Sequence, residues 1–581
     1  MVRSVIYQVK PRKTVEIHLP DGRVLRGPRG TKVGDFLQAL EDLSDPPLMG
    51  AIVNGELREL TYPIHMDAKV QPVTMSDSDG MRIYRRSLSF LLETAFEELF
   101  PDATLTIDHS VASGGYYCQV SGRTPLSVAE LTELEMRMWQ LVEENHPLYR
   151  LKVPLEEAIH YFKEKEYEDK VRLLAHRRKG YLTLYQLKGV RDYHHGYMVP
   201  STGYLRWFSL VPTGEGFTLR FPRRHAPTSL FPLPEYPKLL ATFLQYGEWL
   251  DRLGIASVGA LNDAISEGRI REIILVSEAL HEQQIANIAA LIKSRADMIR
   301  VVLVAGPTSS GKTTFSKRLA IQLLAQGITP IPVEMDNYFL DRQMTPRDEN
   351  GEFDFENFDA MDHEALERDF ICLIRGEAVQ LPRYDFITGI HKPGEVVRLE
   401  AGQIIILEGI HGLNPRILPS IPAEQTFRIY VSALTQLNLD RHNRVSTTDT
   451  RLIRRIVRDA RERGYNAQQT IQYWESVRRG EKRYIFPYQE NADAMFNSAL
   501  VYELSALKPL VEPLLRQVPF GTPEYVEAKR LLSFLEWFLP LESDLIPDNS
   551  ILREFIGNSI LRDFKIWVNH NSHSPFQEKY Q

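Results

Sequence analysis

Cysteine is scarce in this chain, and long apolar runs are missing from it. The 581 residues include two cysteines, Cys118 and Cys372, which lie far apart and outside any CxxC pair. This excludes a disulfide framework and a structural zinc site built from cysteine pairs. Apolar runs such as Val301 to Ala305 are far shorter than the roughly 18 residues of a membrane span, and no secretory-type apolar stretch follows Arg3 and Lys10. We therefore expect a soluble, cytoplasmic protein without membrane contact.

An excess of positive charge is also missing. The chain has 69 Lys and Arg against 76 Asp and Glu, a net charge of −7. A general polyanion binder would be basic, so any contact with nucleic acid must come from a local patch. Apolar residues make up 43% and charged residues 25%, as in soluble globular proteins. At about 100 to 200 residues per domain, the length predicts three to five domains.

Residues 13–75 predict a small β-rich domain. Thr14 to Leu19 alternates as a strand does, a Pro-Asp-Gly turn follows, and Arg23 to Arg26 begins a return strand. Val33 to Leu43 has helical spacing, and Ala51 to Leu57 reads as a hairpin with Asn-Gly at its tip. Through HLPDGRVL, GTKVGDFL and VNGEL this segment resembles the TGS domain, which implies a compact β-grasp-like fold.

Residues 82–235 resemble the editing domain of threonyl-tRNA synthetases. The resemblance rests on a helix from Arg86 to Leu99 and on the segments PDATLTID, SGGYYCQV and VPSTGYL, and it implies an α+β fold. The family carries an HxxxH pair on the helix and a Cys and His later, and the corresponding positions here are Arg86, Phe90, His194 and Met198.

Three of those four ligand-type side chains are therefore missing, and phenylalanine neither binds a metal nor accepts a proton. We predict that this domain does not deacylate tRNA. Three histidines in it are interpreted either as polar loop residues or as the lining of a pocket: His109, His194 and His195.

Two further regions predict packing rather than chemistry. Residues 236–298 form a helical connector, because Leu239 to Leu250 and Ala279 to Ser294 repeat apolar residues at helical spacing. Residues 517–581 are expected to be a C-terminal helical docking segment, with an amphipathic helix from Glu524 to Leu541 and a docking element from Ile551 to Phe564.

The most specific signal begins at Val301. The apolar run to Ala305 predicts a strand buried in a parallel sheet, and it leads into G-x-x-x-x-G-K-T at Gly306 to Thr313, followed by a helix from Thr314 to Ala325. Such a loop turns its amides toward phosphates, and the helix N-terminus adds positive potential. Lys312 would reach the β- and γ-phosphates, and Thr313 would ligate Mg²⁺. The predicted nucleotide-binding residues of this loop are Gly306, Ser309, Ser310, Gly311, Lys312, Thr313 and Thr314.

Two acids follow at the expected ends of buried strands. Thr329 to Met335 predicts a strand that ends at Asp336, and Gln403 to Leu407 predicts one that ends at Glu408. Open α/β sheets bind ligands at that edge. Asp336 suits the base that takes a proton from an acceptor hydroxyl and shares in binding Mg²⁺, and Glu408 suits support of the metal.

Residues 299–516 as a whole resemble the uridine kinase and phosphoribulokinase branch of P-loop kinases. The matching segments, in order, are GPTSSGKTT, DNYF, DFENFDAMD, LPRYDF, ILEGIHGLN and TRLIRRIVRDARERG. The resemblance implies an α/β P-loop kinase fold with a parallel sheet between helices, ATP and Mg²⁺ as cofactors, and Asp336 and Lys312 as catalytic residues. It also implies a nucleoside pocket, formed by Asp336, Tyr338, Glu356, Tyr384, His391 and Arg455.

The arginine-rich segment predicts a lid over the phosphates. Ten Lys or Arg against four acids lie between Arg451 and Arg483, and four arginines from Arg451 to Arg458 recur at helical spacing. Arg455, Arg458 and Arg463 would neutralise charge on the transferring phosphoryl group and exclude water. Arg458 is therefore assigned both a catalytic and a nucleotide-binding role, and Arg463 a nucleotide-binding role.

The substrate is less well defined than the fold. Three positions that contact the base in the family fall on Gly389, Tyr465 and Tyr473, and such losses relax or redirect base choice. The leading hypothesis is an ATP-dependent kinase of the nucleoside 5′-hydroxyl, with uridine or cytidine favoured, and a related one changes the acceptor to another small alcohol. An alternative is an ATP-gated RNA- or ribosome-associated regulator whose N-terminal half contacts RNA. The choice between ATP and GTP, and a homo-oligomeric state, stay open.

Overall fold

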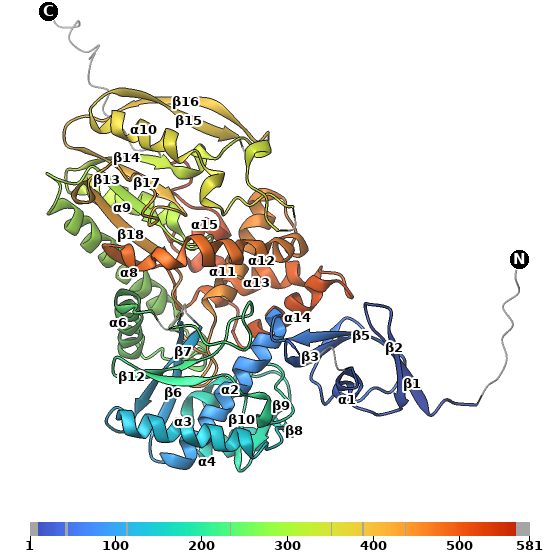
Figure 1. Cartoon of the computed structure of the whole chain (residues 1–581). Coiled ribbons are helices and arrows are strands. Elements are labelled where there is room, and N and C mark those ends of the chain that lie inside the picture. The colour runs from blue at the N-terminus through green and yellow to red at the C-terminus, as the bar shows by residue number, and fades with distance from the viewer. Residues whose placement is uncertain are drawn as a thin grey trace, which may run out of the picture.

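The computed structural model describes residues 10–40, 45–111, 114–232, 234–349, 351–385, 388–435 and 437–564. Figure 1 shows the small β-rich unit at one side, the two antiparallel sheets below, and the parallel sheet above them. Helices from the C-terminal part of the chain lie between these parts. Within the described residues, none of the helices combines the length and hydropathy needed to cross a membrane.

The first unit is a five-stranded mixed sheet in the order β2-β1-β5-β3-β4. Its strands are β1 (Thr14–His18), β2 (Val24–Pro28), β3 (Leu48–Val53), β4 (Glu56–Arg58) and β5 (Ala68–Thr74). β1 pairs with β2 in antiparallel register and with β5 in parallel register, and β3 and β4 form the predicted hairpin. Helix α1 (Val33–Gln38) packs on this sheet and is shorter than the predicted helix, part of which lies outside the described residues.

The second unit combines two antiparallel sheets with helices. Its central helix, α2 (Ser78–Leu99), begins eight residues before the predicted start and is buried along most of its length. The first sheet has the order β11-β12-β7-β6 and the second β10-β9-β8. The elements are β6 (Thr104–Val111), β7 (Gly115–Ser121), α3 (Val128–Glu143), β8 (Tyr149–Pro154), α4 (Leu155–Glu164), α5 (Glu168–Ala175), β9 (Tyr181–Leu187), β10 (Val190–Asp192), β11 (Ser209–Thr213) and β12 (Gly216–Arg220).

Residues 236–298, the predicted connector, contain three helices within the described part of the chain. The helices are α6 (Pro237–Leu253), α7 (Val258–Ser266) and α8 (Ile270–Lys293). Their apolar residues join one continuous core with the parallel sheet, including Ile285 and Ile292 from α8 and Phe315 from the helix after the glycine-rich loop. The connector therefore shares one core with the parallel sheet and with part of the second unit.

The third unit is built on a five-stranded parallel sheet in the order β14-β17-β13-β18-β19. The strands are β13 (Val301–Ala305), β14 (Thr329–Glu334), β17 (Gln403–Gly409), β18 (Thr426–Ser432) and β19 (Ala494–Asn497). β13 is buried at every residue, as its unbroken apolar run predicts. Helices α9 (Lys312–Ala325) and α10 (His363–Ile374) belong to this unit, and β15 (Ala378–Asp385) and β16 (Ile390–Arg398) form a separate hairpin. Phe386, in the predicted pocket segment, lies outside the described residues.

The arginine-rich segment and the C-terminal segment complete the molecule. The first forms α11 (Thr447–Arg458), a π-turn (Asp459–Arg463) and α12 (Ala467–Tyr484). Then come α13 (Glu503–Arg516), α14 (Pro523–Leu535) and the short α15 (Arg553–Ile556). The predicted helix from Glu524 to Leu541 ends at Leu535 instead, and residues 565–581 lie outside the described part of the chain.

Candidate active site

The glycine-rich loop joins β13 to α9 with a tightly curled backbone. Gly311 has a φ of 85°, and Ser309 adopts a φ of 57° without being glycine. A Cβ at Gly306 would stand 1.9 Å from the carbonyl oxygen of Val431, so only glycine fits against β18. The hydroxyls of Ser309 and Ser310 are buried without a hydrogen-bond partner among the described residues. Curled amides and free hydroxyls at a helix N-terminus suit phosphate oxygens.

The metal-type residues of the prediction meet at the end of this loop. The Thr313 hydroxyl donates to Glu408 Oε2 at 3.1 Å. Glu408 pairs in register with Val304 on one side and Glu334 on the other, so it belongs to the end of β17 rather than to the loop after it. Burial raises the pKa of Glu408 to about 7, and nearby Asp336 adds to that effect. A hydroxyl and a carboxylate of this kind are oxygen ligands that fit Mg²⁺.

Asp336 lies directly after β14, at the same sheet edge. Its side chain is exposed at the surface of the protein. Partial desolvation by the surrounding protein raises its pKa, and the cations Lys312, Arg463 and Arg458 lower it. Lys312 is buried, and its Nζ donates to the carbonyl oxygen of Pro307 at 3.2 Å. The structure therefore brings Asp336, Lys312 and Glu408 together at one place.

Glu356, within the DFENFDAMD segment, lies near the same groups. Burial raises its pKa, Arg455 and Lys312 lower it, and Asp336 raises it further. Its Oε2 is buried without a hydrogen-bond partner among the described residues. An unpartnered acceptor atom between a lysine and an acid is available to a hydroxyl-bearing substrate.

The predicted lid arginines divide into two groups. Arg455, Arg458 and Arg463 surround Asp459, with nitrogen to oxygen distances of 3.2, 3.4 and 3.6 Å. Burial and the neighbouring Arg463 lower the pKa of Arg458 to about 10. Asp459 can neutralise only one of the three positive charges, so the group keeps positive charge that would attract a phosphate.

Arg451 and Arg454 face the other way and are buried. Arg451 pairs with Glu481 and donates from Nε to the carbonyl of Thr308 at 2.9 Å. Arg454 pairs with Glu503 at 2.6 Å and also bonds to Ser498. These two arginines therefore fasten α11 to the glycine-rich loop and α13, and the helix does not present all four arginines on one open face.

The predicted nucleoside residues are only partly brought together. Tyr384 is buried, with Phe339 and His391 as ring neighbours at 6.0 and 5.6 Å. His391 is exposed on β16 and lies 3.1 Å from Asp341. Tyr338 is 1% exposed and its hydroxyl donates to Asp369 at 3.1 Å, so the structure places it in the core under the site instead of beside a substrate.

Glu554, which the sequence did not indicate, lies at the end of the glycine-rich loop. The backbone N–H of Thr314, the third residue of α9, donates to Glu554 Oε2 at 3.1 Å. Ile551 touches the position of a Cβ on Gly311, and Arg461 donates to the carbonyl of Phe555 at 2.6 Å. The C-terminal segment thus places a carboxylate at the helix N-terminus. Its separation of 240 residues from Thr314 leaves no local signal for it.

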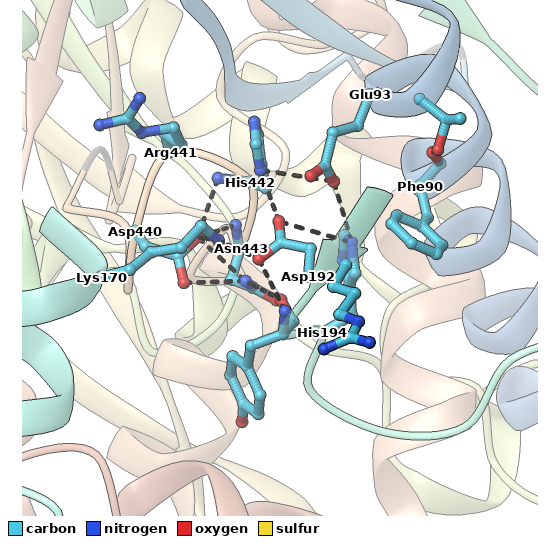
Figure 2. A network of polar contacts seen from close by, with 12 residues as sticks. Phe90, Glu93, Lys170, Asp192, His194, Asp440, Arg441, His442 and Asn443 are labelled. Atoms are coloured by element: carbon cyan, nitrogen blue, oxygen red, sulfur yellow. Dashed lines mark hydrogen bonds and ion pairs between the residues drawn. The ribbon is translucent and has the colours of Figure 1, made fainter. Parts of the chain in front are cut away.

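The editing-like unit holds a buried polar network where the family's ligands would lie (Figure 2). Phe90 is an apolar neighbour of His194 at 5.1 Å, and His194 lies 3.2 Å from Glu93 and 3.9 Å from Asp192. Lys170 bridges Asp192 and Asp440 at 2.8 and 2.9 Å, and His442 lies 2.7 Å from Asp192. The network therefore joins this unit to residues 440–443 of the kinase-like unit.

The three predicted histidines differ in their surroundings. His194 and His195 border two cavities. His109 is instead packed against Phe243, with ring centroids 3.9 Å apart.

Residues 301–505 match the Phosphoribulokinase / Uridine kinase family. This confirms the resemblance of the C-terminal half and its α/β fold. The N-terminal half matches threonine–tRNA ligases, as predicted.

Those relatives share only part of their length with this chain. The ligase of Clostridium kluyveri is 32% identical over 190 residues, which cover 32% of this chain and 30% of the relative. The ligase of Laribacter hongkongensis is 34% identical over 203 residues, 35% of this chain and 32% of the relative. The chain thus spans about a third of the length of these curated relatives.

Two solved structures illustrate the neighbours of the kinase-like unit. D-glycerate 3-kinase from Cryptococcus neoformans is 16% identical, with a TM-score of 0.20, over 45% of this chain and 89% of that one. A possible uridine kinase from Bacillus stearothermophilus is 20% identical, with a TM-score of 0.24, over 35% and 98%.

Proposed function

We propose that the protein transfers the γ-phosphoryl group of ATP to the 5′-hydroxyl of a nucleoside, with uridine or cytidine favoured. The observation that carries the proposal is the meeting of Lys312, Asp336 and Glu408 at the end of a glycine-rich loop in a segment that matches a kinase family. The family match supports phosphoryl transfer from ATP to a small substrate. The nucleoside is the finer part of the proposal.

Each group has a defined task in this mechanism. The free hydroxyls of Ser309 and Ser310 and the loop amides would hold the phosphates of ATP, and Thr313 with Glu408 would hold Mg²⁺, which supplies charge neutralisation between the phosphates. Asp336 accepts the proton of the acceptor hydroxyl as the bond to phosphorus forms. Arg455, Arg458 and Arg463 turn from Asp459 toward the phosphoryl group and exclude water.

The acceptor side rests on Glu356 and Tyr384. The unpartnered Oε2 of Glu356 would accept a hydrogen bond from a sugar hydroxyl, and buried Tyr384 would pack beside the sugar or base. Tyr465 and Tyr473, at positions where the family reads the base, are both exposed with their rings 6.3 Å apart. Their rings are available for stacking on a base.

An acceptor screen tests the proposal. The full chain with Mg²⁺ and ATP is incubated with ribonucleosides, deoxynucleosides and small sugar alcohols, and the mass of each phosphorylated product is measured. We expect at least one nucleoside monophosphate. Products from sugar alcohols alone would refute the nucleoside while keeping the kinase, and no product from any acceptor would refute both.

Asp336→Asn tests the role of the base. We expect kcat to fall about 10² to 10⁴-fold, the usual contribution of a general base, while the Kd for ATP changes little. Glu364→Gln, at an exposed acid on α10, is the control and should keep full activity. Equal kcat in Asp336→Asn and in the unaltered protein would contradict the assignment.

A further inference from the structure

One of the two cavities that His194 and His195 border carries an excess of positive charge. Its volume is about 270 Å³, and its lining comes mainly from α2, residues 442–449, α12 and α14. Eight arginine or lysine side chains line it, against the two carboxylates Asp449 and Glu475. The lining thus carries a local excess of six positive charges within a chain whose net charge is −7.

Four of these cations have partners. Arg82 pairs with Glu527 at 2.8 Å, Arg530 with Asp449 at 2.8 Å, Arg478 with Glu481 at 2.8 Å, and Arg224 with Glu475. Both carboxylates of the lining are thus already paired, and the lining has no further carboxylate for the other four cations.

The remaining four have no carboxylate within ion-pair distance among the residues described: Arg85, Arg86, Arg444 and Lys482. The Nε atoms of Arg85 and Arg444 are buried without a hydrogen-bond partner in that same part of the chain. The guanidiniums of these two residues stack on Phe221 and Tyr116, at 4.6 and 5.1 Å.

Unpaired cations this close together oppose folding. Burial, with Arg444 and other cations as neighbours, lowers the pKa of Arg85 to about 10, and burial and nearby arginines do the same to Arg86. Leaving charged groups partly buried and unpaired is costly. An anion in the cavity would remove the repulsion and supply acceptors for the free N–H groups.

We propose that this cavity binds a phosphate-bearing ligand of about nucleotide size. Phosphate fits because arginine forks match its oxygens and several cations converge on one volume. The size fits because 270 Å³ is near the lower end of small-molecule pockets, about 300 to 1,000 Å³.

The cavity is connected to the nucleotide site through α12. Arg478 and Lys482 line the cavity, Arg478 pairs with Glu481, and Glu481 pairs with Arg451, which bonds to Thr308 of the glycine-rich loop. On the same helix, Gly480 packs directly against Glu356. A bound phosphate that attracts Arg478 would therefore act on α12, the helix that carries these contacts. A ligand at either site would then change the affinity of the other site by the same factor.

Inorganic pyrophosphate is the probe for the experiment, with the full chain. Because pyrophosphate also suits the glycine-rich loop, calorimetry is performed on Lys312→Ala, which removes the loop lysine. We expect Lys312→Ala to keep pyrophosphate binding, with an affinity that falls steeply with salt. Adding Arg85→Gln and Arg444→Gln should lower the affinity at least tenfold. Arg252→Gln with Arg269→Gln, two exposed arginines, is the charge-matched control and should bind as Lys312→Ala does.

Two results would overturn the site. The first is loss of all pyrophosphate binding in Lys312→Ala. The second is an unchanged affinity after Arg85→Gln and Arg444→Gln, together with a lower Tm, because the two arginines would then serve the fold alone. The expected thermal result is the reverse: pyrophosphate raises the Tm of Lys312→Ala and leaves that of the arginine variant unchanged.

Competition distinguishes the source of the phosphate. AMP and a short single-stranded RNA are each titrated against bound pyrophosphate in Lys312→Ala. Stronger displacement by AMP assigns a free nucleotide, and stronger displacement by RNA assigns an RNA end. Displacement by neither would contradict the proposed ligand class. None of these binding results depends on phosphoryl transfer, so failure of the kinase proposal leaves them intact.

Discussion

Glu356 is the residue on which acceptor binding should depend most. Its Oε2 is buried and unpartnered, and Arg455 and Lys312 lie near enough to lower its pKa. Glu356→Gln keeps the shape and removes the charge. We expect the KM for the acceptor to rise about tenfold, the worth of one hydrogen bond to a charged group, with the KM for ATP unchanged, as measured by steady-state kinetics with each substrate varied in turn.

Glu352→Gln provides the comparison, since Glu352 is an exposed acid four residues earlier. Its kinetics should match those of the unaltered protein. A rise in the KM for ATP in Glu356→Gln, with acceptor binding unchanged, would place Glu356 on the nucleotide side instead.

At this scale, the sequence predicted residues whose position follows from a strand end. Asp336 follows β14 and Glu408 ends β17, where apolar runs indicated them, and Lys312 and Thr313 begin α9, where the glycine-rich motif indicated them. No sequence signal indicated the partners of Tyr338 and Arg451, because each side chain bonds to a residue distant in sequence. Asp369 lies 31 residues from Tyr338, and Glu481 lies 30 residues from Arg451.

Among the elements, α15 contacts the N-terminus of α9 directly. Glu554 accepts the N–H of Thr314 at the N-terminus of α9, a position that also favours phosphate. Glu554→Gln removes a negative charge that would repel ATP. We expect the Kd for ATP to fall by about 2 to 5-fold, because a charge at a helix N-terminus contributes about 0.3–1 kcal/mol. Calorimetry without an acceptor measures it.

Asp548→Asn supplies a control, because Asp548 is 71% exposed and lies in the same C-terminal segment. ATP affinity should stay unchanged there. Weaker ATP binding in Glu554→Gln would show instead that the carboxylate holds the loop in its binding form.

Helix lengths were less predictable than helix positions. The helix at Val33 ends at Gln38, and residues 41–44 lie outside the described part of the chain. The helix at Pro523 ends at Leu535, and Leu541 then bonds to the carbonyl of Ser505 at 2.9 Å. Pro540 disfavours helix in the residue before it, but the prediction of a helix to Leu541 rested on apolar spacing alone.

For the molecule as a whole, the network in Figure 2 is a major connection between its two halves. Lys170 is 2% exposed and neutralises Asp192 from one half and Asp440 from the other. Lys170→Met would leave two buried carboxylates without their cation. We expect a loss of about 3–5 kcal/mol in the free energy of unfolding, measured by urea denaturation.

A more exposed pair gives the reference value. Lys188 pairs with Glu98 at 2.9 Å and is 33% exposed, so Lys188→Met should cost about 1 kcal/mol or less. Similar losses in the two variants would show that the Lys170 network contributes no more than a surface pair.

Buried histidines give the folded protein a defined sensitivity to acid. Burial and Arg318 lower the pKa of His281 to about 3, and its Nε2 lies 3.2 Å from the carbonyl oxygen of Ala499. Above pH 6.5 the ring is neutral in both states. Below it the unfolded chain binds a proton that the folded chain does not, so stability falls as the pH falls, by about 2 kcal/mol at pH 5 for this residue.

His281→Asn should therefore show a shallower decline between pH 6.5 and pH 5 in urea unfolding. His160→Asn, at a 77% exposed ring, should keep the slope of the unaltered protein. An equal slope in all three proteins would mean that His281 takes up its proton without unfolding.

The segment 438–443 contacts a surface formed by much earlier parts of the chain. Asn438 donates to the carbonyl of Ile107, Arg441 to Asp169, and Asn443 to the carbonyl of Tyr193. During translation the ribosome releases those acceptors first, so the surface is already synthesised when residues 438–443 emerge. A gene that begins near residue 299 would therefore yield a fragment whose segment 438–443 lacks these acceptors.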